Sequence, residues 1–383
     1  MKKKINKKSV EILALEFHKK NRGKIEIKPK TKLTQEVLRL AYTPGVAAVS
    51  SHVAKNKADT NTYTWRGNTV AVVSDGSAVL GLGNIGPEGA LPVMEGKSYL
   101  FKALANVDAV PVVLGTHDTE EIIATIKNIA PSFAGINLED IAAPRCFEIE
   151  KRLKEMLDIP VMHDDQHGTA MVVLAGLINA LKVVKKKKES VKVVVAGAGA
   201  AGAAITEMLL GYGIHDVLVV DSKGVLALSD ITLTGYKKSL AERTNKHLVV
   251  GTLIDALLGA DVFIGVSKGN TVTAEMIQLM NKNAIVFAMA NPIPEIMPEE
   301  AKRGGAVVIA TGRSDFPNQV NNSLGFPGIF RGALDNKVRN ITDSMLVRAA
   351  EALAKLVAKP TAKQILPKTF DPRVAKAVAK AIK

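Results

Sequence analysis

Four carboxylates, arranged as two adjacent pairs, have the spacing and setting of a cation site. Each pair directly follows a short apolar run, and the pairs are Glu139-Asp140 and Asp164-Asp165. If both runs are strands of a parallel sheet, both pairs lie at carboxyl ends of strands, where open α/β sheets bind ligands. Carboxylates crowded at one sheet edge repel one another unless a cation neutralises them. Ligands that are all oxygen suit Mg²⁺ or Mn²⁺ rather than zinc, so we expect one of these two ions.

Two histidines, His163 and His167, flank the second acidic pair. They could be metal ligands, but further nitrogen ligands are missing nearby, so hydrogen bonding is the role we expect for them. For either acidic pair alone, the ordinary alternative is solvated surface charge. The apolar segments that flank both pairs favour the cation site instead.

A glycine-rich turn in the second half of the chain predicts a dinucleotide site. The apolar run 191–196 enters a G-x-G-x-x-G turn, and a helical apolar pattern follows at once. The first glycine permits the tight turn, the second lets a pyrophosphate approach the backbone, and the third lets helix and strand pack closely. Free N–H groups at the helix N-terminus then face the phosphates. The residues expected to bind the dinucleotide in this turn are Gly197, Gly199, Ala200, Ala201 and Gly202.

An acidic residue ends the next predicted strand and bears on the choice of cofactor. Asp221 stands 19 residues after the last glycine of the turn, where a carboxylate can accept hydrogen bonds from ribose hydroxyls and favours NAD. Ser222 and Lys223 follow it directly and could bind a 2′-phosphate instead. The residues therefore leave NAD and NADP both open. The alternative is a Rossmann-like fold that binds no cofactor.

Strands that alternate with helices along the whole chain are expected to position these groups in two parallel sheets. Strands are predicted at 70–74, 110–114, 134–138 and 159–162, and then at 191–196, 216–221, 261–265, 284–288 and 306–310. Helices are predicted at 9–20, 33–41, 93–105, 119–129, 144–157 and 168–184, and from 342 onward, with a loop over 81–92. The fold class is therefore α/β, with an N-terminal α/β domain over 1–162 and a C-terminal Rossmann-type domain over 163–383.

Composition limits the other classes of function. The chain has 383 residues and a net charge of +14, but only 4% are aromatic, and the lysines are not interleaved with aromatics as a single-strand binding surface requires. We therefore expect no nucleic-acid partner. The lysine-rich start, 1–8, has no apolar core after it, and the run 171–184 is too short for a bilayer, so no membrane association is expected. One cysteine, Cys146, excludes an internal disulfide and fits a cytoplasmic protein.

Two further residues stand out by their settings. Tyr42 precedes a Thr-Pro-Gly turn, and Lys97 follows a glycine on a mostly apolar helix. A tyrosine in such a place more often packs than reacts. A lysine on an apolar helix either extends its amine to solvent or takes part in chemistry.

Five motifs, taken in order, resemble those of the malic enzymes of the short bacterial and archaeal type, over nearly the whole chain. They are LAYTPGVA at 40–47, SDGSAVLGLGNIG at 74–86, MEGK at 94–97, NLEDI at 137–141 and HDDQHGTA at 163–170. The dinucleotide turn stands beside them. The resemblance implies a homodimer that converts (S)-malate to pyruvate and CO₂ with reduction of NAD or NADP, and that depends on a divalent metal.

The same resemblance implies a role for each matching residue. Metal ligands would be Glu139, Asp140 and Asp165, and residues that contact substrate or nicotinamide would be Asn291, Asn321 and Asn322. Lys97 matches the general base and Tyr42 the general acid, while Asp164 matches the acid beside the lysine. A basic lysine needs its pKa lowered by burial or by the nearby cation, or its proton relayed onward.

Two positions depart from the family pattern. Ala78 stands where the longer, eukaryotic-type enzymes carry a substrate-binding arginine, so the substrate carboxylate needs other donors. Arg145 stands where the short type is expected to have an acidic residue, which leaves its role open.

Three other functions remain as alternatives. The first is a dehydrogenase for another 2-hydroxy acid, or one that yields lactate directly. The second is a sensor that binds nucleotide or metabolite without turnover, against which Lys97, Tyr42 and the carboxylates argue. The third is a nucleic-acid binder, which the scarcity of aromatic residues disfavours.

Overall fold

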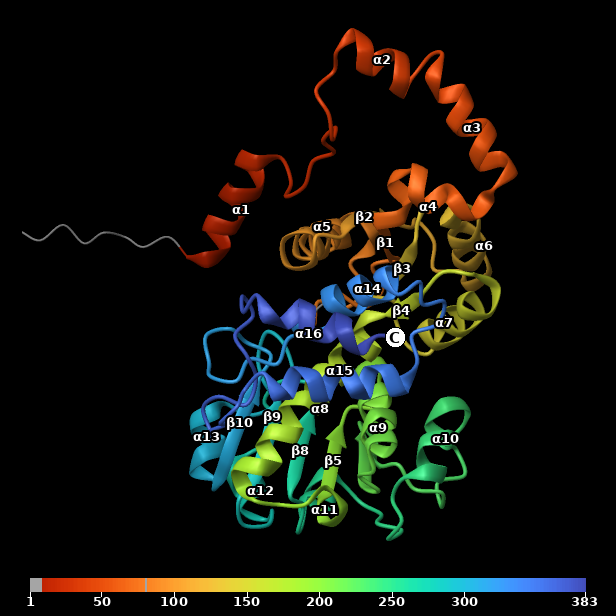
Figure 1. Cartoon of the computed structure of the whole chain (residues 1–383). Helices are drawn as coiled ribbons and strands as arrows, with labels where there is room; N and C mark the ends of the chain where they lie inside the picture. Colours follow the sequence, from red (N-terminus) through yellow and green to blue (C-terminus); the bar gives the residue numbers. More distant parts are fainter. Residues whose placement is uncertain (1–8, 80) are drawn as a thin grey trace, which may run out of the picture.

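The computed structural model describes residues 9–79 and 81–383, so the lysine-rich stretch 1–8 and Leu80 of the motif 74–86 lie outside it. Two sheets form the body of the molecule, one above the other in Figure 1, and a long central helix joins them. The α/β fold class with two parallel sheets is confirmed.

The first sheet carries one acidic pair and leads into the other. Its strands are all parallel and stand in the order β2-β1-β3-β4, with bounds β1 (Thr69–Ser74), β2 (Asp108–Val113), β3 (Gly135–Leu138) and β4 (Val161–His163). Successive β1 side chains face opposite sides. Ala71 and Val73 pack with α6 (Thr119–Ile129) and α7 (Arg145–Met156), whereas Val70 and Val72 pack with α5 (Gly86–Ala105).

The second sheet carries the glycine-rich turn. Its order is β10-β9-β8-β5-β6-β7, parallel except for β7, with bounds β5 (Lys192–Ala196), β6 (Asp216–Asp221), β7 (Gly224–Val225), β8 (Val262–Gly265), β9 (Ala284–Ala288) and β10 (Ala306–Thr311). The chain returns to β8 on the far side of β5, and this reversal marks the crevice where doubly wound sheets bind ligands. The helices around it are α9 (Ala200–Tyr212), α10 (Gly235–Arg243), α11 (Leu253–Leu257), α12 (Ala274–Gln278) and α13 (Pro298–Arg303).

The joining helix, α8 (Asp164–Val184), begins four residues before the predicted start at 168. Asp164 and Asp165 therefore lie in its first turn, where the helix dipole favours negative charge. With this extra turn α8 is long and apolar enough to cross a membrane by length and composition, which corrects the expectation from 171–184. Most of the helix is buried against α9 and α15 (Asp343–Lys355), as in a core helix.

The C-terminal helices connect the two halves of the molecule. Helices α14 (Phe326–Asp335) and α16 (Arg373–Ala381) pack against α5 of the first half, and Phe101 on α5 contacts the rings of Phe326 and Phe330 at 4.7 and 5.5 Å. One hydrophobic core runs without interruption from β1 through α8 to these helices. The division at residue 163 stays a prediction, and the part beyond 325 packs on both sides of it.

Three predicted segments differ from the structure. Helix α5 begins at Gly86 inside the predicted loop, because Pro87 at its first turn suits a helix start and Pro92 is accommodated within it. The tail from 342 is interrupted, since α15 ends at Lys355 and α16 begins only at Arg373. Helix α3 (Gly45–Lys55), after the Thr-Pro-Gly turn, was not predicted.

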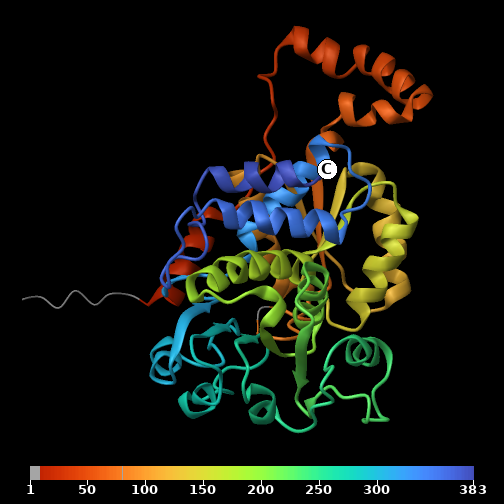
Figure 2. The same ribbon diagram turned by 60° about the horizontal axis from the view of Figure 1, so that its bottom comes forward.

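The N-terminal helices pack less than the rest of the described chain. Neither α1 (Val10–Asn21), α2 (Gln35–Ala41), α3 nor the short α4 (Thr60–Tyr63) contains a buried residue. Figures 1 and 2 both show α2 and α3 standing away from the body. We call residues 33–55 the arm. Its exposed large apolar side chains are Leu33, Leu38, Leu40 and Tyr42.

Candidate active site

The two acidic pairs meet at one edge of the first sheet. Glu139 and Asp140 follow β3, and Asp165 follows the neighbouring strand β4, whose His163 pairs with Leu138. One carboxylate oxygen from each of Glu139, Asp140 and Asp165 lies within 4.8 Å of the others. The backbone N–H of Asp140 donates to Oδ2 of Asp165 at 2.8 Å. Pairing of the two strands thus brings together the three residues expected to hold the metal.

This cluster fits a hard divalent cation. Glu139 and Asp140 are almost wholly buried, and two buried oxygens beside them, Oδ1 of Asp164 and Oδ1 of Asn137, have no hydrogen-bond partner within the described residues. Buried acceptors without donors are costly, and a cation offsets that cost. The donors are all oxygen, which suits Mg²⁺ or Mn²⁺.

Lys97 lies against the cluster from α5. The residue is 9% exposed. Its Nζ contacts Asp164, lies 3.0 Å from Oε1 of Glu139 and stands 4.5 Å from the centre of the Phe326 ring. Burial lowers the pKa of Lys97, but Asp164, Glu139 and Asp165 raise it more, so the net shift is upward. Burial raises the pKa of the Asp164 carboxyl, whereas the nearby Lys97 amine lowers it. The net pKa of Asp164 is about 6.

The upward pKa shift bears on the predicted base. Burial, the nearby cation or relay of the proton was expected to leave the Lys97 amine free to accept a proton, and of these burial is outweighed by the carboxylates. A cation among the carboxylates would oppose their effect on the amine. Asp164, in direct contact with Nζ, is the nearest group to which the lysine could pass a proton.

The two histidines stay outside the group of possible metal ligands. His167 Nε2 hydrogen-bonds Oε2 of Glu150 at 3.0 Å, which is the kind of role expected for it. His163 is buried, and its ring nitrogens have no hydrogen-bond partner in the described part of the chain. Its Nδ1 lies 3.8 Å from Asp165.

Glu150, on α7, is a residue that sequence reasoning missed. It accepts the backbone N–H of His163 at 3.1 Å and pairs with Lys154 at 2.7 Å. Burial raises the pKa of Glu150, but His167 and Lys154 lower it more, so the net shift is downward. Its position on the otherwise apolar face of α7, beside Ile149, was the signal available in the sequence.

The glycine-rich turn has the geometry that its sequence predicts. Gly197 has φ of 117°, and a Cβ on Gly202 would lie 1.7 Å from the Gly197 carbonyl, so both positions need glycine. Helix α9 starts at Ala200. The turn thus leaves the helix N-terminus open to phosphates.

One cavity of about 460 Å³ joins the turn to the carboxylates. Residues predicted as sites that line it are Asp140, Asp165, Gly199, Ala200, Ala201, Asn291, Asn321 and Asn322. Ala78 lines it too. Groups predicted separately for cofactor, metal and substrate therefore share one space between the two sheets.

Asp221 has a partner that the sequence did not indicate. Lys237 Nζ on α10 lies 2.6 Å from Oδ2 of Asp221, and the backbone N–H of Lys223 donates to Oδ1 at 2.8 Å. Burial raises the pKa of Asp221, but Lys237 and the Lys223 amide lower it by more. The net shift of the pKa is downward, which favours the ionised carboxylate. The carboxylate is thus paired with a cation where a ribose is expected.

Arg145 has a structural position, although its role was open. Its guanidinium donates to Oδ2 of the buried Asp75 at 2.9 Å and to Ser77 at 3.1 Å. The next residue, Ala78, donates its backbone N–H to the Asp140 carbonyl at 2.9 Å. Arg145 therefore holds the loop that contacts a predicted metal ligand.

Tyr42 lies elsewhere. It follows α2 on the arm, is 66% exposed, and is not among the described residues that line either cavity at Lys97 or at the turn. The space above Lys97 is a cavity of about 870 Å³ whose other lining includes Phe17, Tyr99 and Asn322. Within one chain, the predicted general acid and general base are not brought together, because the arm is not packed on the body.

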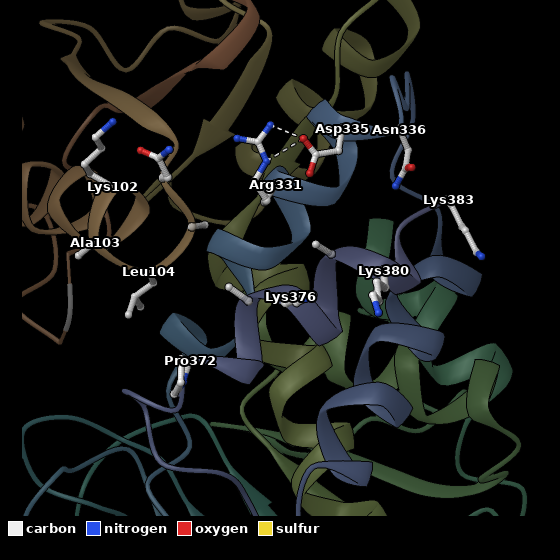
Figure 3. A pocket seen from close by; sticks show the side chains of 14 residues that line it. Lys102, Ala103, Leu104, Arg331, Asp335, Asn336, Pro372, Lys376, Lys380 and Lys383 are labelled. Atoms are coloured by element: carbon white, nitrogen blue, oxygen red, sulfur yellow. Dashed lines mark hydrogen bonds and ion pairs between the residues drawn. The ribbon is translucent and has the colours of Figure 1, made fainter. Parts of the chain in front are cut away.

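A separate cavity of about 750 Å³ lies between the end of α5, α14 and α16 (Figure 3). Its lysines are Lys102, Lys376, Lys380 and Lys383, and Arg331 beside them pairs with Asp335 at 2.6 Å. The described residues that line it include none predicted as a site. Part of the excess positive charge thus gathers away from the carboxylates.

Comparisons with known proteins agree with this geometry. The family model described as "Malic enzyme, N-terminal domain" matches residues 19–154, and "Malic enzyme, NAD binding domain" matches residues 166–383. The chain is 53% identical over 378 residues to the "Bifunctional malic/malolactic enzyme" of Bacillus subtilis, covering 96% of this chain and 91% of that protein. It is 46% identical over 392 residues to the "NADP-dependent malic enzyme" of Rhizobium meliloti, covering 96% of this chain and 51% of that protein.

A solved structure has the same fold. The crystal structure of an NAD-dependent malic enzyme from Thermotoga maritima superposes with a TM-score of 0.93 at 52% identity, over 97% of this chain and 98% of that one. Since the two family models together span most of the sequence and these relatives cover nearly all of it, the chain belongs to the malic enzyme family.

Proposed function

We propose that this protein oxidatively decarboxylates (S)-malate to pyruvate and CO₂, with NAD or NADP as the hydride acceptor and Mg²⁺ or Mn²⁺ as the metal. One observation carries the proposal: the dinucleotide turn, two of the three clustered carboxylates (Asp140 and Asp165) and the three asparagines line a single cavity, while Lys97 contacts the third carboxylate, Glu139, beside it. In this proposal the base and two of the metal ligands belong to the predicted domain 1–162, and the cofactor binds to the predicted domain 163–383. Asp164 and Asp165 lie at the junction of the two.

The chain's own residues have the following roles in this proposal. The cation supplies Lewis-acid polarisation of the substrate oxygens, and the nicotinamide supplies the hydride acceptor. Glu139, Asp140 and Asp165 hold the cation. Lys97 takes the proton of the substrate hydroxyl, and Asp164 receives it from the amine. The asparagines Asn291, Asn321 and Asn322 orient substrate and nicotinamide by hydrogen bonds, because Ala78 offers no cationic donor.

Tyr42 completes the site, in our proposal, from a second copy of the chain. The arm exposes Leu38, Leu40 and Tyr42 without covering them, and short helices with no buried residue gain little stability by themselves. The cavity above Lys97 is lined in part by apolar and aromatic side chains and opens beside the base. A homodimer in which each arm reaches the other copy's cavity would bury both surfaces and deliver the acid that protonates the enol.

Mixing two inactive variants tests this arrangement. In a mixed dimer of Tyr42→Phe and Lys97→Ala chains, the site built on the first chain has its own Lys97 and the partner's Tyr42, so it is intact. After exchange of subunits, about a quarter of wild-type activity should return, since half of the dimers are mixed and half of their sites are complete. If Tyr42 serves its own chain, every site in the mixture is defective and activity stays at background.

A direct assay tests the reaction. Malate with Mn²⁺ should yield pyruvate, CO₂ and reduced cofactor in equal amounts, and excess chelator should stop turnover. Full activity in chelator would refute the metal site. Lactate without net reduced cofactor would instead support the direct route named for the Bacillus subtilis relative, which is the second candidate.

Cofactor choice should be permissive. Asp221 can accept from a ribose hydroxyl, but Lys237 neutralises it and Lys223 follows it, which lowers the repulsion of a 2′-phosphate. We propose that both NAD⁺ and NADP⁺ support turnover in the same assay. A single accepted cofactor would refute this. The proposal also places the enzyme in the cytoplasm, in keeping with its free, buried Cys146.

A further inference from the structure

Glu295 is a buried carboxylate that the proposed chemistry does not use. It follows β9 in the segment 291–296 and is wholly inaccessible to solvent. Its Oε1 accepts the backbone N–H of Ser267 at 2.8 Å, and its Oε2 accepts the backbone N–H of Ala290 at 3.0 Å. Each carboxylate oxygen thus accepts one backbone N–H, and the side chain ties the loop that contains Ser267 to the loop that contains Ala290.

The two amides belong to loops that follow neighbouring strands. Ser267 follows β8 and Ala290 follows β9, and both residues line the cavity shared by the dinucleotide turn and the carboxylates. In a doubly wound sheet one half of the dinucleotide lies over each half of the sheet. The turn after β5, with Asp221 after β6, takes the adenosine half, which leaves the loops after β8 and β9 for the nicotinamide half.

The surrounding backbone is built around this carboxylate. A Cβ on Gly265 would lie 2.4 Å from the Glu295 carboxyl carbon, so the side chain has room only because residue 265 is glycine. The backbone N–H of Val272 donates to the Glu295 carbonyl at 3.0 Å, and that of Asn270 donates to the Pro294 carbonyl at 3.0 Å. The segment that carries Glu295 is therefore fixed on the loop after β8.

We infer that Glu295 is a positioning residue for the nicotinamide half of the cofactor. Its two oxygens set the separation of the loops at Ser267 and Ala290, and through Ala290 they set the place of Asn291. The side chain itself reaches neither cofactor nor substrate. This inference rests on the proposed use of a nicotinamide cofactor.

Binding of two ligands tests it without turnover. NADH carries the nicotinamide ring, whereas ADP-ribose carries the adenosine, the pyrophosphate and the second ribose without that ring. Glu295→Gln keeps the shape of the side chain but places an NH₂ group, which cannot accept a hydrogen bond, against the backbone N–H of either Ser267 or Ala290. The loop that contains that residue then loses its hydrogen bond to residue 295. NADH affinity should fall roughly tenfold, as for one charge-assisted hydrogen bond, while ADP-ribose affinity stays within about twofold. Titration calorimetry or NADH fluorescence measures both.

Two variants make the result decisive. Glu300→Gln is the matched control, because Glu300 is only partly buried and pairs with Arg303 on the surface helix α13, and it should change neither affinity. Gly265→Ala pushes the Glu295 carboxylate aside without removing its charge, and it should weaken NADH selectively as well.

Equal loss of NADH and ADP-ribose would assign Glu295 a general structural role and overturn the inference, as would unchanged NADH binding. If Glu295→Gln does not fold, the Gly265→Ala result decides by the same criterion. A wild-type chain that binds NADH but does not oxidise malate would refute the proposed function and leave this inference standing.

Discussion

The body and the arm hold the two halves of the proposed acid–base chemistry in contrasting ways. In the body, Lys97 is 9% exposed and is bonded to carboxylates from two other segments. On the arm, Tyr42 is 66% exposed and no residue of α2 or α3 is buried. Packing within the chain positions the first half but not the second, for which we propose packing against a second copy.

This difference separates the residues that are positioned by contacts within the chain from those that are not. The carboxylates are assembled by pairing of β3 with β4, which also builds the core. The arm contributes nothing to that core, so its sequence is free to serve an interface. Variants of each half should therefore separate effects on chemistry from effects on assembly.

Lys97→Ala should have the largest effect. Removing the base should lower kcat for malate oxidation by at least about a thousandfold, and leave a buried Asp164 without its cation. Steady-state kinetics with malate and Mn²⁺ measures it. Lys102→Ala, on the same helix but exposed and paired with Asp108, is the control and should stay active. Normal turnover by Lys97→Ala would remove the base assignment.

Tyr42→Phe should have the second largest effect. It should lower the rate of enol protonation by about a hundredfold, because the proposed general acid is lost. The phenyl ring keeps the packing of the arm, so the dimer should be unchanged. Exchange of pyruvate methyl protons with solvent reports this half-reaction directly. Exchange at the wild-type rate would show that Tyr42 is not the acid.

Leu40→Asp should break the arm's contact rather than the chemistry. A charge on this exposed leucine should dissociate the dimer, and activity should fall about tenfold or more at dilute enzyme and recover as the concentration rises. Sedimentation velocity measures the state. Leu228→Asp, at another exposed leucine on the second half, should leave the dimer intact. An unchanged dimer in Leu40→Asp would contradict the arm exchange.

The metal affinity of the body should depend on pH, with the smallest effect of the four. Burial raises the pKa of Asp164 to about 6 and that of Glu139 well above its usual range, against the opposing effect of Lys97. The metal-free chain therefore takes up protons as the pH falls toward 6, and a cation must displace them. Mn²⁺ affinity should drop up to about tenfold per pH unit below that point.

Calorimetry in buffers of different ionisation enthalpy measures this proton release. Tyr42→Phe should show the same pH dependence, because Tyr42 lies outside the body's cluster. A flat Mn²⁺ affinity between pH 5 and 8 would show that the carboxylates are already ionised without the metal, and would weaken the view of the body as a preassembled, strongly desolvated site.

Much of the site was predictable because its signals are local. The turn at Gly197 and Gly202 needs glycine for steric reasons that act within a few residues. The acidic pairs after β3 and β4 could be placed from strand patterns, since parallel strands end at one edge. The first turn of α8 was missed, because Gly168 interrupts the helical pattern there.

The remaining parts depend on distant partners. Arg145 meets Asp75 across 70 residues, Glu150 meets His167 across 17, and Lys237 on α10 meets Asp221 across 16. Nothing near Arg145 in the sequence distinguishes a loop-holding arginine from a surface one. Only packing decides such pairs.

Local patterns and motif identity were enough to predict the α/β class, the glycine-rich turn, the family and the types of chemical group in the site. The packing of the folded chain sets which of these groups meet. It placed Lys97 in contact with Asp164 and Glu139, and these carboxylates raise the pKa of the amine by more than its burial lowers it. It also left Tyr42 outside the body, because a helix without a buried face is positioned only by what it packs against.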